Sequence, residues 1–226
     1  MILSVHQPQY LPWLGFFHKI AKSDIFVFLD DVQYKKREFQ NRNKIRTKNG
    51  WLWLTVPVIT KGKYNQKILE VEIDNTSDWA VEHFRSIELN YSKAEFFKEH
   101  RNFFESLYKK KWEKLIDINL EIIKYIMNCW NIKTPVYFSS SLNLQTSKTQ
   151  RIIDICKHFK ADTYLSGSGG KDYLEESLFH QNNIKLIYQK FEHPVYQQCF
   201  SGFEPYMSAI DLLFNCGQDG RKYLEI

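Results

Sequence analysis

Cysteine is scarce in this sequence, and long hydrophobic runs are missing from it. The four cysteines, Cys129, Cys156, Cys199 and Cys216, lie far apart, and no two of them have the spacing of a metal-binding pair. No apolar run approaches the ~20 residues that a membrane helix requires, and no secretory signal is recognisable. We therefore expect a cytoplasmic protein with reduced thiols and without membrane insertion.

The signatures of common catalytic sites are absent as well. There is no cluster with metal-ligand spacing, no Ser/His/Asp signature and no carboxylate pair at a diagnostic spacing, so the sequence predicts no protein metal site. The net charge of +5, from 31 basic and 26 acidic residues, suits an anionic ligand but does not indicate nucleic acid. Hydrophobic residues make up 43% of the 226 positions, which is enough for a folded core.

Hydrophobic patterning divides the chain into three segments. Residues 1–75 and 133–226 alternate short apolar runs with amphipathic stretches, which is typical of a parallel sheet covered by helices. Residues 76–132 keep a helical period and predict a helical insertion. A turn at Asn49-Gly50 predicts a β-hairpin in the first segment. The expected fold class is α/β, with a Rossmann-like, mostly parallel sheet, a hairpin extension and a helical insertion.

The individual elements follow from the same patterning. Strands of the sheet are predicted at residues 2–5, 25–29, 135–138, 162–165 and 184–191, hairpin strands at 39–45 and 51–58, and a further strand at 67–73. Helices are predicted at residues 14–21, 79–91, 94–109, 112–130, 149–160 and 205–215, with a short one that ends at 179.

The N-terminal stretch joins a strand to a helix through a polar loop. Pro8 and Pro12 prevent helix within the loop, because each lacks a donor and extends its predecessor. His6 and Gln7 therefore lie at the carboxyl end of a strand, in front of a helix N-terminus. Free N–H groups at such an end favour anions such as phosphate.

A glycine-rich turn follows a later strand. Residues 166–172 place three glycines and two serines between a strand and a helix, so the backbone can approach a phosphate, and Lys171 adds positive charge. The spacing matches neither a Walker A loop nor the dinucleotide fingerprint, and a flexible turn is the alternative. Because parallel strands end at one edge of a sheet, we expect a nucleotide to bridge this turn and His6. His6 and Lys171 are the catalytic candidates. His6 would stabilise or protonate a phosphate oxygen, and Lys171 would neutralise the negative charge that develops in the transition state.

Other polar residues complete the predicted nucleotide- and substrate-binding site. Asp30 and Asp31 follow a buried strand, where a turn or cap role is the alternative. A basic segment that begins at Lys35 is either a solvated face or a phosphate-contacting loop. Mg²⁺ would accompany the phosphates. The candidate binding residues are Gln7, Tyr10, Trp13, Asp30, Asp31, Arg37, Gln40, Asn41, Arg42, Asn43, Ser166, Gly167, Ser168, Gly169, Gly170 and His193.

Six stretches of the chain form a specific set. They are residues 6–17 (HQPQYLPWLGFF), 26–33 (FVFLDDVQ), 39–43 (FQNRN), 53–58 (WLTVPV), 164–174 (YLSGSGGKDYL) and 210–217 (IDLLFNCG). Together they span almost the whole chain, and they resemble the WbqC-like family of bacterial polysaccharide-locus proteins. Members of that family commonly lie among genes for O-antigen (lipopolysaccharide) and other surface glycans. The resemblance therefore implies a sugar or a nucleotide-linked sugar as substrate.

A more distant similarity links the chain to the nucleotidylyltransferase-like superfamily, which includes adenylate-forming pantothenate synthetases. The His-x-Gly-His motif of that superfamily is replaced here by His6-Gln7-Pro8, with Pro12-Trp13-Leu14-Gly15 in the same loop. The two resemblances imply a transferase or adenylate-forming ligase that uses ATP or a nucleotide-sugar. The expected reaction is ATP-dependent activation of a small amino or carboxylic acid and its transfer to a nucleotide-linked amino sugar.

Three other functions stay open at this point. They are a sugar nucleotidylyltransferase, a glycosyltransferase and a non-catalytic nucleotide- or carbohydrate-binding protein. We expect small-molecule partners rather than nucleic acid, and a homodimer is one open alternative for the assembly.

Overall fold

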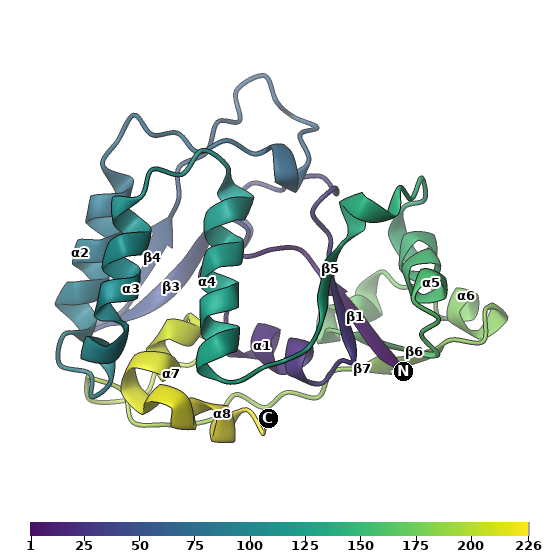
Figure 1. Ribbon diagram of the computed structural model, residues 1–226. Helices are drawn as coiled ribbons and strands as arrows, with labels where there is room; N and C mark the ends of the chain where they lie inside the picture. Colours follow the sequence, from purple (N-terminus) through teal and green to yellow (C-terminus); the bar gives the residue numbers. More distant parts are fainter. Residues whose placement is uncertain (226) are drawn as a thin grey trace.

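A five-stranded parallel sheet lies in one half of the computed structural model, which describes residues 1–225 (Figure 1). The strands lie in the order β5-β2-β1-β6-β7, and every neighbouring pair is parallel. The chain first builds outward from β1 to β2 and β5, and then returns to the other side of β1 to place β6 and β7. The predicted α/β, Rossmann-like class is confirmed. The strands are β1 (Ile2–His6), β2 (Ile25–Phe28), β5 (Val136–Phe138), β6 (Thr163–Ser166) and β7 (Lys185–Tyr188).

Helices surround this sheet and continue into a second, mostly helical half of the molecule. None of the helices within residues 1–225 is long and apolar enough to cross a membrane. The helices are α1 (Leu14–Ala21), α2 (Trp79–Tyr91), α3 (Phe97–Lys109), α4 (Leu115–Cys129), α5 (Lys148–His158), α6 (Glu176–Gln181), α7 (Ala209–Cys216) and α8 (Gly220–Tyr223).

Both faces of the sheet are covered, and the alternation of side chains along β2 shows how. Phe26 and Phe28 point to α1, where their ring centroids lie 5.8 and 6.4 Å from that of Phe16. Val27 points to the opposite face and joins a core that includes Ile153 of α5. A strand covered on both faces needs apolar residues at every position, which accounts for the continuous run in the sequence.

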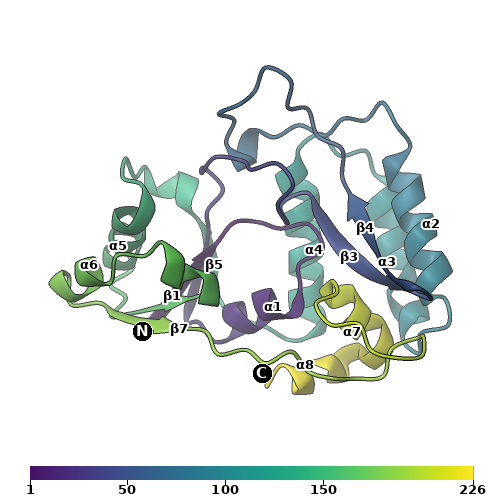
Figure 2. The same ribbon diagram turned by 180° about the vertical axis from the view of Figure 1, so that it is seen from behind.

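The predicted helical insertion is confirmed, and it packs with elements from both ends of the chain. Figure 2 shows α2, α3 and α4 beside the antiparallel hairpin of β3 (Arg42–Thr47) and β4 (Gly50–Thr55). Phe214 of α7 lies within this group, with its ring centroid 5.2 Å from those of Tyr91, Phe97 and Phe104.

The predicted strand at residues 67–73 is wrong. The chain there forms η1 (Ile68–Glu70), a single 3₁₀ turn in which the Glu70 carboxylate accepts the N–H of Lys67 at 2.8 Å. Its neighbours pair only as isolated bridges, one of them between Val58 and Ile73. Ile68 and Ile73 are buried without a continuous ladder, so their spacing in the sequence reflects burial and not a strand.

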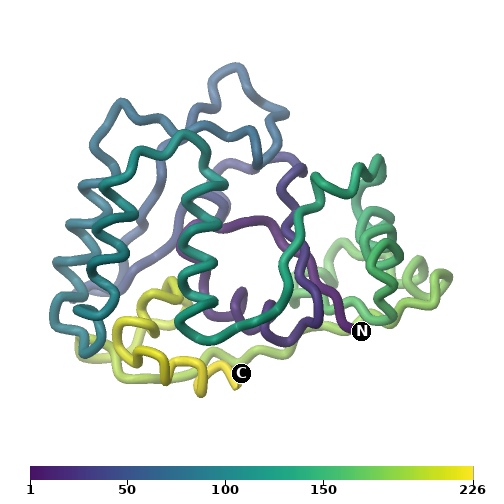
Figure 3. Tube along the Cα trace, in the orientation of Figure 1, coloured from purple at the N-terminus to yellow at the C-terminus, as the bar shows by residue number. Residues whose placement is uncertain are grey.

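After β7 the chain crosses back to the helical half (Figure 3). The last strand is shorter than predicted, and the terminal helix begins at Ala209 rather than at 205. Two backbone bonds of 2.8 Å fix its start, from the N–H of Ser208 to the Lys44 carbonyl and from the N–H of Ala209 to the Pro12 carbonyl. Residues of this tail, such as Tyr196, belong to the same core as α2 to α4.

Candidate functional site

A cavity of about 450 Å³ lies where the order of the strands reverses, at the carboxyl ends of β1 and β6. These two strands are paired directly through Ile2 with Thr163 and Leu3 with Tyr164. The loops that follow them therefore meet, although they are far apart in the sequence. His6, Gln7, Ser166, Gly167, Gly169 and Gly170 are the predicted site residues that line this cavity, which we call the large chamber.

His6 is the last residue of β1, and its ring is half-buried against Phe16. The Nδ1–H donates to the Gln7 carbonyl at 3.0 Å, which leaves Nε2 without a proton in the neutral ring. Burial and the neighbouring Lys19 ammonium lower the pKa of His6 to about 3. The imidazole is therefore neutral at pH 7, and a bound anion would raise its pKa by offsetting the charge of Lys19.

Lys19 reaches the large chamber from α1 and is only 4% exposed. Its Nζ donates to the carbonyl oxygen of Val5 at 3.1 Å, and no carboxylate in residues 1–225 lies within ion-pair distance of it. Burial lowers the pKa of Lys19 to about 7. An ammonium group that is removed from water and has no counter-ion is costly, and a bound anion would relieve that cost.

The glycine-rich turn is η3 (Ser168–Asp172), a 3₁₀ turn that packs closely on β6. A Cβ on Gly170 would overlap Ser166 Oγ and lie 3.0 Å from Leu174 Cδ1, so a larger residue there would force these side chains to shift. The Gly170 N–H donates to the Gly167 carbonyl at 3.0 Å and is already engaged within the turn. A Cβ on Gly167 would lie 3.9 Å from Lys19 Nζ, so this backbone borders the buried ammonium group.

Further cations face the large chamber, and none of the residues that line it is acidic. Lys35, Lys148 and Arg151 belong to its wall. Arg151 is 9% exposed and is held by an ion pair with Asp31. Lys148 begins α5 at a φ of 53°, a left-handed conformation that is uncommon for a lysine. The chamber is thus strongly cationic.

Lys171 does not line this chamber, which corrects the predicted placement beside His6. Its Nζ lies 5.3 Å from the ring centroid of Tyr188 on β7. Successive side chains of a 3₁₀ turn diverge by a third of a revolution. Gly169 and Gly170 therefore border the chamber while the next side chain points elsewhere. The charge expected from Lys171 is supplied by Lys19 and the other cations.

The two aspartates after β2 fasten a loop rather than line the chamber. Asp30 accepts the N–H and the hydroxyl of Ser140 at 2.9 and 2.6 Å. Asp31 accepts the hydroxyl of Ser139 and pairs with Arg151. Their turn role, left open by the sequence, is the one found, and Asp31 positions a cation of the chamber.

The amides of residues 39–43 are structural as well, and none of them lines the large chamber. Asn41 Nδ2 donates to the Val56 carbonyl at 2.8 Å, and Asn43 Nδ2 donates to the Leu11 carbonyl at 2.6 Å. Gln40 is 3% exposed. Leu11 has a φ of 45°, so Asn43 supports a strained residue of the N-terminal loop.

Three more candidates lie away from the large chamber. The Arg42 guanidinium is 4.5 Å from the ring centroid of Trp53 and donates to the Arg37 carbonyl. Arg37 is exposed. Tyr10 is buried, with its hydroxyl 2.8 Å from His83 Nδ1. The basic segment therefore contributes Lys35 to the chamber, but not the arginines that were predicted.

A second cavity of about 210 Å³ adjoins the first, and we call it the small chamber. Its own wall includes Trp13, Ser168 and Phe191. His193 lies just outside it, where Nε2 accepts the N–H of Tyr206 at 3.1 Å. The residues common to both chambers are His6, Lys19, Gly167 and Gly169.

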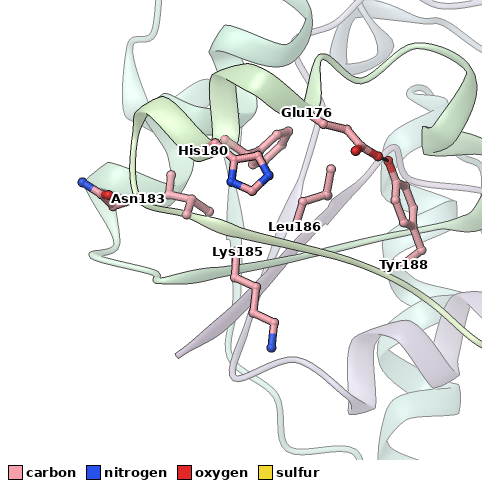
Figure 4. A pocket seen from close by; sticks show the side chains of 8 residues that line it. Glu176, His180, Asn183, Lys185, Leu186 and Tyr188 are labelled. Carbon is pink, nitrogen blue, oxygen red and sulfur yellow. Dashed lines mark hydrogen bonds between the residues drawn. The ribbon is translucent and has the colours of Figure 1, made fainter.

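A separate hollow of about 430 Å³ lies between α6 and the edge strand β7 (Figure 4). Figure 4 shows Glu176 directed at Tyr188, whose hydroxyl donates to it at 2.8 Å, and Lys185 directed away from His180. Its ionisable side chains do not converge on a common point. We therefore place the functional site in the two chambers at β1 and β6.

The prediction from sequence missed Lys19 and the cations of α5. Lys19 lies within a helix of which seven residues in succession are buried, Leu14 to Ile20. A charged residue on such an apolar helix was the available signal. No group of three or more His, Cys, Asp and Glu in residues 1–225 is arranged to hold a metal ion.

Comparison with known proteins relates the chain to a family and to a similar protein. The model of the WbqC-like protein family matches residues 7–223. The chain belongs to the WbqC-like family. It is 37% identical over 224 residues to an uncharacterized protein of Mycobacterium tuberculosis (strain ATCC 25618 / H37Rv), Rv1507c, covering 98% of this chain and 96% of that protein. No solved structure matches the chain.

Proposed function

We propose that this WbqC-like protein is an enzyme of surface-glycan biosynthesis that binds a nucleotide in the large chamber. The observation that carries the proposal is Lys19, a buried ammonium group at the reversal point of a parallel sheet that has no counter-ion among residues 1–225. Ligands of open α/β sheets bind at this point. A phosphorylated ligand would supply the missing negative charge.

The walls of the large chamber suit the parts of a nucleotide. Lys19, Lys35 and Arg151 would neutralise phosphate oxygens. Tyr173 lines the chamber and is 65% exposed, so its ring offers a face to a base. Mg²⁺ would be held chiefly by the phosphates, because the two carboxylates after β2 are engaged by serines and by Arg151.

The proposed reaction has two steps that balance. In the first, a carboxylate oxygen of a small amino or carboxylic acid attacks the α-phosphorus of ATP, and the bond to pyrophosphate breaks. In the second, the amine of a nucleotide-linked amino sugar attacks the acyl carbon of the acyl adenylate and a C–N bond forms. The bond from that carbon to the bridging oxygen breaks, and AMP leaves with this oxygen. The amine loses one proton in that step. The cations of the chamber would stabilise the charge that develops on the phosphate.

His6 is suited to accept the proton that the amine loses in the second step. Its Nδ1–H is fixed on the Gln7 carbonyl, so Nε2 is the free base of the neutral ring. Phosphate bound beside it would raise its pKa from about 3 toward the working range, because a negative neighbour favours the protonated imidazole. His6 would then accept the amine proton.

The test measures products from defined substrates. The protein is incubated with ATP, Mg²⁺ and each common amino acid, and then with dTDP-4-amino-4,6-dideoxyglucose as acceptor. Pyrophosphate and AMP release that depends on both substrates supports the proposal. Lys19→Met should abolish it, whereas Lys22→Met should not, because Lys22 lies at the end of α1 and bonds to the Glu225 carbonyl at 2.8 Å.

Other outcomes favour other functions. Pyrophosphate release from a nucleoside triphosphate and a sugar 1-phosphate, without AMP, would identify a nucleotidylyltransferase. Release of a nucleoside diphosphate from a nucleotide-sugar would identify a glycosyltransferase. Binding without turnover would identify a non-catalytic binding protein. If no nucleotide binds or shifts the melting temperature, the proposal is overturned.

A further inference from the structure

The small chamber has a different chemistry from the large one. Its wall includes Trp13, Phe16 and Phe191, and the side-chain amide of Gln189. Beyond the residues that it shares with the large chamber, no charged side chain contributes to it. The large chamber is cationic and the small chamber is aromatic, and they share one wall. Such a pair of cavities suits two different chemical groups that meet at that wall.

Trp13 is held so that its indole forms a fixed surface. The ring lies so close to Gly15 that a Cβ there would overlap it. Phe191 meets it edge-on, with ring centroids 5.5 Å apart. Gln189 Nε2 donates to the Gly15 carbonyl at 2.8 Å, which fixes the amide beside the same segment. An aromatic face next to a fixed amide complements a sugar ring, whose C–H groups are apolar and whose hydroxyls are polar.

Size argues against a second nucleotide here. The volume of about 210 Å³ is less than half that of the large chamber. Pockets for drug-sized ligands usually measure about 300 to 1,000 Å³. The small chamber is below that range and has room for a group of about one ring.

We infer that the small chamber is the acceptor subsite, and that it binds the pyranose ring of an amino sugar on Trp13. The inference rests on the proposed function and names the second substrate of the same site. An amine bound at the shared wall would lie near both His6 and Lys19, between the donor in the large chamber and the aromatic surface. The Lys19 ammonium group on this wall also disfavours protonation of a neighbouring amine, which keeps the amine nucleophilic.

Calorimetric titrations with two probes, ATP and D-glucosamine, separate the chambers. Trp13→Leu should weaken the binding of D-glucosamine about tenfold and change that of ATP less than twofold. Tyr173→Leu, in the large chamber, should show the reverse pattern. Tyr206→Leu is the matched control, because its ring contacts Trp13 at a centroid distance of 6.2 Å without lining either chamber, and it should change neither.

Saturation-transfer NMR on the unmodified protein adds a readout that needs no variant. Irradiation of aromatic protons should saturate the ring C–H protons of D-glucosamine, and ATP should leave that signal in place. Displacement of the sugar by ATP, a Trp13→Leu effect on ATP alone, or no binding of D-glucosamine would overturn the inference. Sugar binding that depends on Trp13 in a protein that does not bind ATP would overturn the proposed function and leave the subsite standing.

Discussion

Two buried cations, Lys19 and Arg46, show how differently the two halves of this protein treat positive charge. Arg46 of β3 is 3% exposed, and its guanidinium donates to the carbonyls of Gly50 and Ser201 at 2.9 and 2.8 Å. It also donates to Gln198 Oε1 at 3.2 Å. Lys19 is 4% exposed but has one carbonyl partner and a cavity beside it. Similar burial therefore serves structure in one place and ligand binding in the other.

The polar groups around Arg46 form a hydrogen-bond network centred on a buried carboxylate. Asp211 of α7 is fully buried and accepts hydrogen bonds from Tyr91, Tyr196 and Gln198. Burial raises the pKa of Asp211 to about 6, and the charge of Arg46 acts in the opposite direction. This network ties the hairpin, α2 and the C-terminal tail together, so every polar group in it has a structural partner.

The largest expected effect comes from removing Arg46, the buried cation whose hydrogen bonds are all made within the protein. Arg46→Met should lower the free energy of unfolding by about 3 kcal/mol, because it removes the donor to the buried carbonyls of Gly50 and Ser201 and the positive charge near Asp211. Urea denaturation measures this. Arg42→Met is the control on the same strand, since Arg42 covers the Trp53 ring and donates only to the carbonyl of the exposed Arg37, and it should cost about 1 kcal/mol or less. Equal losses would contradict the distinction between the two arginines.

Removing Lys19, the buried cation beside the cavity, should weaken ligand binding without lowering the stability of the fold. Lys19→Met should weaken ATP binding by about 30-fold, equivalent to about 2 kcal/mol for a charge-assisted bond. The free energy of unfolding should not fall, because the variant removes a desolvated ammonium group. Calorimetry and urea denaturation test the two parts. A large loss of stability would instead make Lys19 a structural residue like Arg46.

The pH dependence of stability should reveal the buried ammonium group of Lys19. The pKa of Lys19 is about 7 in the folded protein and near 10.5 in the unfolded chain, so the unfolded chain binds more protons between these values. Between pH 7 and 8.5 the stability of the protein should therefore rise relative to that of Lys19→Met. ATP affinity should fall over the same range, because the ammonium group loses its proton. Parallel stability curves for the two proteins would show that Lys19 stays charged.

The smallest effect is expected at Lys171, which was predicted from the sequence to be catalytic. Lys171→Ala should change ATP binding less than about threefold and stability by at most about 0.5 kcal/mol, because its side chain rests on Tyr188 outside the chamber. The same titrations and melts measure it. A loss as large as that of Lys19→Met would mean that the turn η3 rearranges to bring Lys171 to the ligand.

The loops could be located from sequence because local chemistry decides them. Prolines exclude helix from the loop after the first strand, glycines mark the turn at 166–172, and continuous apolar runs mark strands covered on both faces. Parallel topology then requires His6 and that turn to share an edge. Side-chain direction within the loops does not follow from such rules, which is why Lys171 was placed in the chamber and the amides at 39–43 were taken for ligand contacts.

Periodicity and turn residues were enough to predict the α/β class, the helical insertion and the two loops that border the site. Which cations line the large chamber depends instead on how the helices pack on the sheet. Lys19 and Arg151 come from helices on opposite faces of the sheet, and their convergence depends on packing across it. Within the described part of the chain, the same packing left Lys19 without a counter-ion and gave Arg46 several hydrogen-bond acceptors.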